Sequence, residues 1–140
     1  MAAVAHVGFP ALEGALNALY ESGTWKCMLL DNGYTPAEDT HDFISDANAN
    51  EVSATNYTAG GVTVVPTVAF NSTTNQFDIT FPQASVASTT LTARYAVYYQ
   101  DTGTPATSAI GFVNDFGEDV TATNGTFTAN ESSFSINFPD

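Results

Sequence analysis

The stretch of sequence that decides the fold is ARYAVYYQDTGTPATSAIGFVNDFG, residues 93–117. Residues 92–100 and 109–114 are rich in tyrosine, valine and other side chains that favour strands. Between them lies DTGTPATS, whose glycine and proline are typical of a turn. The stretch therefore predicts two strands joined by a turn, which is a pattern typical of an all-β protein.

Similar signals recur along the rest of the chain. Apolar and polar side chains alternate over residues 76–81 and, within the candidate strand 132–138, from residue 133 onward, which is the period of a half-buried strand. The other candidate strands are residues 25–30, 62–65 and 125–129. Pro66 indicates that residues 62–65 form an edge strand or contain a bulge. Short strands at regular spacing predict an antiparallel β-sandwich or a barrel-like domain.

A helical pattern appears near the N-terminus and ends at about residue 22. Leu12, Leu16 and Leu19 recur at helical spacing, and Pro10 suits the first helical turn. We therefore expect a mainly β domain over residues 10–140 that starts with one short helix. Residues 1–9 carry no folding signal of their own, and we expect them to form an N-terminal arm.

The charge balance limits the possible partners. The chain has 140 residues, with two Lys+Arg against fifteen Asp+Glu, which gives a net charge of −13. Proteins that bind nucleic acid or anionic membranes need lysine and arginine to meet the phosphates. We therefore expect neither nucleic acid nor a membrane as a partner. The first twenty residues lack a basic region and are interrupted by Pro10 and Glu13, so we expect no signal peptide.

Side chains that could carry out chemistry are few. His41 lies in the polar stretch 35–55, but no pattern of a nucleophile with an orienting acid accompanies it. We interpret it as a loop histidine that is hydrogen-bonded to a neighbour or to solvent. Acidic residues cluster at 38–46 and 115–119, without the spacing of a calcium loop. The single cysteine, Cys27, lies in an apolar run and is interpreted as a buried core residue. We expect no enzyme, no bound metal and no cofactor.

Two features of the strand at residues 92–100 leave alternatives open. Arg94 either pairs with a carboxylate of the same chain or pairs with an acid of another chain. Tyr95, Tyr98 and Tyr99 either pack in the core or form a platform for sugars. The second alternative for the tyrosines would make the chain a secreted carbohydrate-binding β-module. Lysines commonly guard exposed strand edges, and their near absence suggests that acids or another subunit protect the edges here.

An ordered series of short motifs runs from about residue 12 to residue 128. The series contains WKCMLLD (25–31), YTP (34–36), HDFISD (41–46), EV (51–52), YTAGGVT (57–63), ARYAVYY (93–99), DTGT (101–104), DFG (115–117) and GTFT (125–128). In this order the motifs resemble a widespread family of small virion proteins of tailed bacteriophages. The chain departs from the family pattern at about residues 71–88 and in the tail at 132–140.

The resemblance implies a structural protein of the phage particle, with no catalytic residues. We expect a capsid decoration (cement) protein on the outer surface of the major capsid shell; a neck, tail or fibre-base component fits nearly as well. The implied partners are the major capsid protein and sister subunits, and by analogy with other decoration proteins we expect a trimer. The expected location is therefore the capsid surface of the virion.

The contacts to those partners are expected from the arm at 1–9 and the polar stretch at 35–55. Short arms often become ordered only on a partner, and long loops in small domains are often functional. The candidate interface residues are Val4, His6, Phe9, His41, Phe43 and Arg94.

Overall fold

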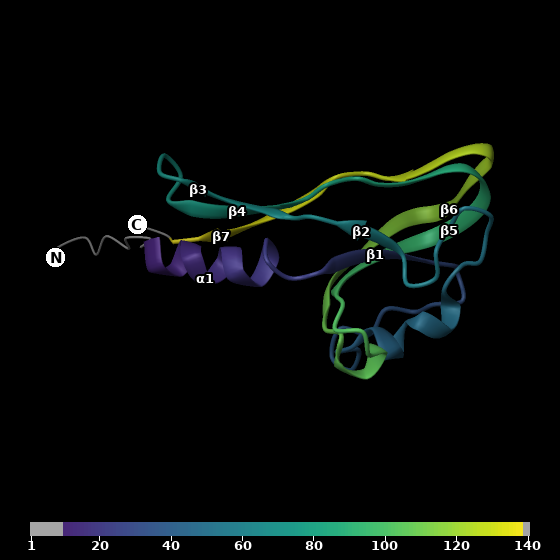
Figure 1. Ribbon diagram of the computed structural model, residues 1–140, viewed down its shortest axis with the longest axis horizontal. Coiled ribbons are helices and arrows are strands. Elements are labelled where there is room, and N and C mark those ends of the chain that lie inside the picture. The colour runs from purple at the N-terminus through teal and green to yellow at the C-terminus, as the bar shows by residue number, and fades with distance from the viewer. Residues whose placement is uncertain (1–9, 139–140) are drawn as a thin grey trace, which may run out of the picture.

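The structure, a computed structural model, describes residues 10–138 and consists mainly of strands (Figure 1). In chain order the elements are α1 (Pro10–Tyr20), β1 (Trp25–Leu30), β2 (Val62–Val64), β3 (Thr67–Asn71), β4 (Gln76–Phe81), β5 (Ala84–Gln100), β6 (Ile110–Ala129) and β7 (Ser132–Asn137). Two antiparallel sheets have the strand orders β2-β1-β5-β6 and β3-β4-β7. The predicted fold class, a mainly β domain with one short N-terminal helix, is confirmed, and of the two predicted architectures, sandwich or barrel-like, the two antiparallel sheets fit the sandwich.

A long two-stranded ribbon connects the two sheets. β4 leads into β5 and β6 leads into β7 after short links, and the pairing runs on from Phe81↔Ser132 to Ala84↔Ala129. The register shifts near Ser88 and Asn124, where both residues have positive φ (52° and 46°). Bulges of this kind bend a strand and increase its twist. The ribbon therefore turns back on itself within β5 and β6, at the right-hand end of the molecule in Figure 1.

The predicted strand boundaries need correction in this ribbon. The structure extends the strand expected at 92–100 back to Ala84, and it joins the strands expected at 109–114 and 125–129 into β6. The glycines and asparagines inside β6, such as Gly117 and Asn124, lie at bends and bulges within one strand. β3 was not predicted, whereas β1 and β4 have the expected bounds. β2 is an edge strand, as Pro66 indicated.

The strand β1, inside the four-stranded sheet, is buried on both faces. Cys27 and Leu29 of β1 belong to one buried cluster, while Met28 and Leu30 belong to another. The first cluster is shared with the other sheet through residues such as Phe77 and Phe81. Because successive side chains of a strand point to opposite faces, the apolar run of β1 fills both clusters. This arrangement explains why residues 25–30 are apolar without alternation.

The polar stretch at residues 35–55 covers one face of this sheet. It forms two 3-10 turns, Ile44–Asp46 and Asn48–Asn50. Ile44 and Ala47 are buried beside Tyr34 and pack in the second cluster. The stretch is therefore an ordered cover.

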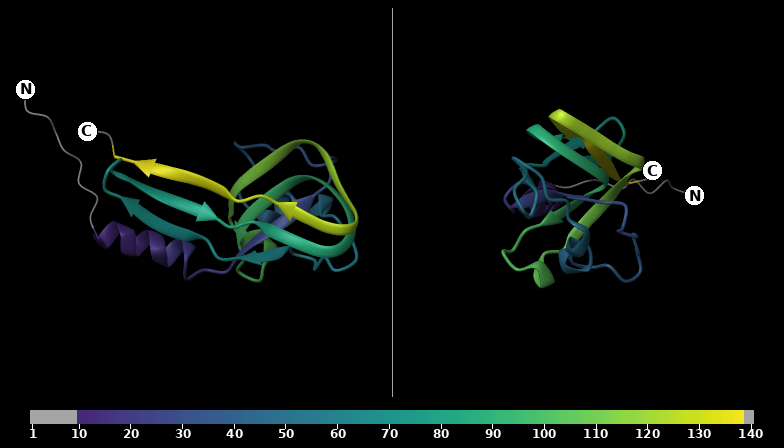
Figure 2. Two further views of the ribbon diagram at one scale, coloured as in Figure 1. Left: turned by 90° about the horizontal axis from the view of Figure 1, so that it is seen from above. Right: turned by 90° about the vertical axis from the view of Figure 1, so that its right-hand side faces the viewer.

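The three-stranded sheet and α1 form a part of the molecule that we call the extension. Figure 2 shows it projecting away from the four-stranded sheet, with α1 running alongside β3. Tyr20 at the end of α1 stacks on Trp25, with ring centroids 5.4 Å apart, and meets the edge of Phe81 at 6.0 Å. These aromatic contacts attach the helix to the shared core.

Candidate functional site

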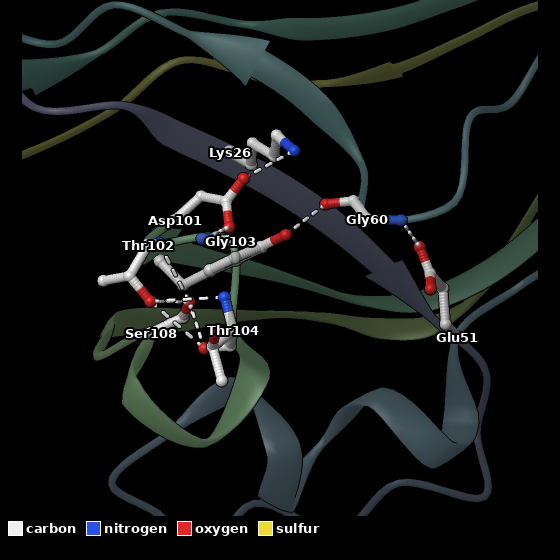
Figure 3. A network of polar contacts seen from close by, with 9 residues as sticks. Lys26, Glu51, Gly60, Asp101, Thr102, Gly103, Thr104 and Ser108 are labelled. Carbon is white, nitrogen blue, oxygen red and sulfur yellow. Dashed lines mark hydrogen bonds and ion pairs between the residues drawn. The ribbon is translucent and has the colours of Figure 1, made fainter.

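A polar network closes the end of the four-stranded sheet around the DTGT motif (Figure 3). Lys26 Nζ lies 2.6 Å from Asp101 Oδ2, and the Gly103 amide donates to Asp101 Oδ1 at 2.9 Å. The hydrogen bond from Lys26, followed by that from Gly103, lowers the pKa of the Asp101 carboxyl. The hydroxyls of Thr102 and Ser108 complete the loop, 3.1 Å apart. The motif therefore holds a tight turn in place.

Glu51 is the centre of a second network beside β1 (Figure 3). Its Oε1 accepts hydrogen bonds from the Tyr57 hydroxyl at 2.8 Å and from the Gly60 amide at 2.6 Å. The Tyr57 hydroxyl also accepts from the Leu29 amide at 3.1 Å, and burial raises its pKa. The Tyr99 hydroxyl donates to the Gly60 carbonyl at 2.6 Å. The sequence analysis gave Glu51 no role, and the structure shows that it holds the 57–60 loop beside β1 through hydrogen bonds.

The double glycine of YTAGGVT allows its loop to lie against β1. Gly60 and Gly61 both have φ of +95°. A Cβ atom at position 61 would lie 2.2 Å from the carbonyl oxygen of Cys27. Only glycine fits this left-handed conformation and this close approach. The motif is therefore explained by packing against the neighbouring strand.

The HDFISD motif folds the start of the cover segment. One carboxylate oxygen of Asp46 accepts from the backbone amides of Asp42 at 3.1 Å and Phe43 at 3.0 Å. His41 Nδ1 lies 3.1 Å from the buried Tyr34 hydroxyl. The interpretation of His41 as a loop histidine hydrogen-bonded to a neighbour is confirmed.

Arg94 forms an ion pair within the chain. Its Nε donates to Asp115 Oδ1 at 2.6 Å and its Nη2 to Asp115 Oδ2 at 3.2 Å, across the β5–β6 pair. The Gly117 amide, at a residue with φ of +82°, also donates to Asp115 Oδ1. These hydrogen bonds, that from Arg94 first, lower the pKa of Asp115. The DFG tripeptide is thus part of a bulge. Of the two alternatives for Arg94, the structure shows the pair with a carboxylate of the same chain.

A hollow of about 620 Å³ lies between the cover segment and β6. His41 and Asp42 line it from one side, and Phe112 and Asp115 from the other. Two of the predicted interface residues therefore lie at the same hollow. His41 lines it directly, and Arg94 pairs with Asp115, which also lines it. Phe43 pairs with Ala109 nearby and is 39% exposed. We call this region the loop end of the molecule.

The other three predicted interface residues, Val4, His6 and Phe9, lie outside the described residues. The first residues of α1 lie at the opposite end of the molecule from the loop end (Figure 1).

The strand tyrosines belong mainly to the core. Tyr98 and Tyr99 are buried in the two clusters, and Tyr95 packs against the second cluster. Tyr98 stacks on Phe112 with ring centroids 4.6 Å apart. The core interpretation of these tyrosines is confirmed, and Tyr98 and Tyr99 are not on the surface where a sugar could stack.

The sequence analysis missed an exposed apolar surface on the extension. Five large apolar side chains there are between 36% and 44% exposed: Leu12, Leu19, Phe70, Phe134 and Ile136. Phe134 and Ile136 of β7 pair with Ile79 and Phe77 of β4, so they extend the apolar face of the sheet. The alternation at 132–138 predicted an apolar face but could not show that α1 leaves part of it uncovered.

The opposite face of the extension is polar and carries little charge. Asp78 Oδ1 accepts hydrogen bonds from Ser135 and Gln76, at 2.6 Å and 2.5 Å. Glu21 Oε1 accepts from the Val68 amide at 2.9 Å, on the outer side of β3. Both acids therefore have hydrogen-bonding roles within the extension.

Comparisons with known proteins add no relative. No family model, curated protein or solved structure matches the chain significantly. Across residues 10–138, no three His, Cys, Asp or Glu side chains are grouped so that they could bind a metal ion. None of the helices in this part of the chain has the length and apolar character needed to span a membrane. The features that point to a function are therefore the two surfaces, the loop end and the exposed face of the extension.

Proposed function

We propose that this chain is a structural component of a tailed-phage virion, and specifically a capsid decoration protein on the outer surface of the major capsid shell. The observation that carries the proposal is that the molecule has two separate surfaces suited to protein contacts, the loop end and the exposed apolar face of the extension. Leu12, Leu19, Phe70, Phe134 and Ile136 are all exposed on one small part of the molecule. Apolar residues gathered on a rigid sheet mark a site of protein–protein contact.

The charge distribution supports a protein partner. Lys26 and Arg94 are the only cationic residues of the chain, and each forms an ion pair with an aspartate of its own chain. Phosphate-rich partners would need free cationic side chains. The surface instead offers acids and an apolar face, which suits a partner that supplies apolar or basic groups.

The motif residues support a structural role as well. Asp46, Glu51, Gly61, Asp101 and Asp115 each hold a loop or a bulge in place through hydrogen bonds or close packing. The motifs that carry the resemblance to phage virion proteins therefore have a common physical role, which is to maintain the shape of the molecule. A rigid shape suits a protein that repeats the same contact many times on a shell, where modest affinity at each site is sufficient.

The two surfaces can be assigned to the two proposed partners. We assign the loop end, with its hollow and the exposed Phe43, to the major capsid protein. We assign the exposed face of the extension to sister subunits. The two surfaces lie at different ends of the molecule (Figure 1), so both contacts can form at once.

The test uses particles of the encoding phage that lack this chain. Purified chain is added back, and the bound amount is measured by co-sedimentation together with the temperature at which the particles release their genome. We expect saturable binding and a higher release temperature. Phe43→Ser should weaken binding, whereas Val65→Ser, a change at a side chain that is 64% exposed elsewhere, should not. Failure of the native chain to bind the particles would contradict the decoration role.

A further inference from the structure

The four outer strands of the two sheets differ in how their edges are protected. β2 has only three residues, so its edge is short. β6 carries Asp115, Glu118 and Asp119 along its length. β3 lies beside α1, and its Val68 amide donates a hydrogen bond to Glu21 Oε1 at 2.9 Å. β7 is the exception, because the described residues place no element along its outer side and SSFSIN itself contains neither charge nor proline; Glu131 and Pro139 lie beyond its two ends.

The hydrogen-bond pattern of β7 identifies the backbone groups on its free edge. The Phe138 amide donates to the Asn75 carbonyl at 3.0 Å, in register with the pair Gln76↔Asn137. In an antiparallel pair, residues that bond to the neighbour alternate with residues whose N–H and C=O point away. Ser133, Ser135 and Asn137 therefore direct their backbone groups outward, away from β4.

We propose that β7 pairs antiparallel with β7 of a second copy of this chain, so that two three-stranded sheets become one six-stranded sheet. The outward groups allow a register in which Ser135 lies opposite Ser135 of the other copy. In that register Phe134 of each chain lies beside Ile136 of the other, because both belong to the same face. The pairing covers the unprotected edge and joins the two exposed apolar faces into one.

Charge makes a second copy a suitable occupant of this edge and disfavours the other edges. Two chains with a net charge of −13 each repel one another, so they can meet only where acids are few. The elements of the extension and the residues directly flanking them contain four described acids, Glu13, Glu21, Asp78 and Glu131. Two of them are already hydrogen-bonded within the chain. β7 itself has none, so the same strand from a second copy brings no like charges together within the paired segment, and Glu131 lies just outside it.

The proposed function assigns the exposed face of the extension to sister subunits, and this inference names the strand through which they meet. It rests on the proposed function only in that respect. It can be tested in solution without any phage particle. A two-fold pair also differs from the trimer that the family resemblance implies, so the mass of the purified chain distinguishes the two. Binding to capsids and pairing in solution can each fail while the other holds.

The first experiment measures the mass of the full purified chain by sedimentation equilibrium over a range of concentrations. We expect a reversible dimer of twice 14.7 kDa. A monomer at all concentrations, or a trimer, would overturn the proposal. A native chain that stays monomeric but dimerises once residues 1–9 are removed would also overturn it, since that result would assign the face to the chain's own N-terminal segment.

Two variants test the interface itself. Ile136→Ser removes an apolar side chain that is 37% exposed, and Val120→Ser replaces a comparably exposed apolar side chain, at 38%, on β6. We expect the first to raise the dimer dissociation constant at least about ten-fold and the second to leave it unchanged. Ser133→Pro removes one outward N–H and should give a monomer with an unchanged circular dichroism spectrum. A dimer that is unaffected by both Ile136→Ser and Ser133→Pro does not use β7.

Cross-linking tests the register. Directly opposed residues of an antiparallel pair lie within disulfide distance, roughly 5.5 Å between Cα atoms. Ser135→Cys should therefore form a disulfide-linked dimer under mild oxidation, while Thr126→Cys, at another exposed strand position, should not. The native Cys27 is buried and should not interfere. Equal cross-linking at both positions would indicate random collision and contradict the register.

Discussion

At the scale of single residues, the motif residues of this chain serve close packing and hydrogen bonding. Gly61 lies so close to the Cys27 carbonyl that no larger residue fits, and Cys27 is itself fully buried. Glu51 and Tyr57 tie the same loop to β1 through hydrogen bonds of 2.8–3.1 Å. The conformation of the YTAGGVT loop and the position of β1 therefore depend on one another.

Replacing Gly61 tests that dependence. Gly61→Ala combines a positive φ with a Cβ 2.2 Å from a backbone oxygen, and we expect it to lower the free energy of unfolding by at least about 3 kcal/mol. Gly103→Ala is the control, because Gly103 also has positive φ but a Cβ there meets nothing within 4 Å. It should cost only about 1 kcal/mol. Equal losses in urea unfolding would show that the close approach has no energetic weight.

The thiol of Cys27 gives a second prediction at this scale. Burial raises its pKa to about 12, so the reactive thiolate is scarce at neutral pH. We expect no reaction with a thiol reagent in the native chain at pH 8 and one thiol per chain after unfolding in urea. Rapid stoichiometric labelling of the native protein would mean that β1 is accessible and that the core is not packed as described.

At the scale of elements, the sequence predicted where helices and strands lie better than it predicted which segments join into one strand. The bounds of β1 and β4 and the position of α1 follow from local periodicity, because each has a clear apolar pattern. The join between 109–114 and 125–129 could not be predicted, since residues such as Gly117 and Asn124 are equally common in turns and in bulges. β3 was missed because it is short, follows Pro66 directly and ends in a turn rich in asparagine and threonine.

The candidate site was predictable only in part. The hydrogen-bonded loop role of His41 and the pairing of Arg94 with a carboxylate were expected from their neighbourhoods in the sequence. The exposed face of the extension was not, because exposure depends on how much of the sheet α1 covers. That coverage is set by tertiary packing around Tyr20, which contacts Trp25, Phe81 and Phe134.

The ion pair that connects β1 to the DTGT loop should appear in the pH dependence of stability. The pKa of Asp101 is lowered in the folded state, so its contribution is present at neutral pH and is lost as the pH falls below about 4. Asp101→Asn should cost about 1 kcal/mol at pH 7, because both partners are mostly shielded from solvent.

The measurement is urea unfolding of both proteins at pH 7, 5 and 3. The difference in unfolding free energy should be smaller at pH 3 than at pH 7 or 5, because pH 3 lies below the ordinary pKa of an aspartate, where the stabilisation that comes from the lowered pKa of Asp101 begins to be lost. A difference that stays the same at all three values would mean that the Lys26–Asp101 pair contributes nothing to stability.

At the scale of the whole molecule, the distribution of charge should govern assembly. Two chains of net charge −13 repel one another, and salt screens this repulsion. We therefore expect added sodium chloride, from about 0.05 to about 0.5 M, to tighten the β7-mediated dimer. Ile136→Ser should remain the weaker dimer at both salt concentrations. A dimer that weakens as salt is added would require attraction between opposite charges at the interface, which the sequence of β7 cannot provide.

The central claim is that this chain decorates the capsid of a phage, and its copy number in the particle tests that claim most directly. Quantitative mass spectrometry of purified virions compares this chain with the major capsid protein. We expect hundreds of copies, in a ratio to the capsid protein of one or a simple fraction of one. About a dozen copies would place the chain in the neck or tail, and its absence from the particles would contradict the proposed function altogether.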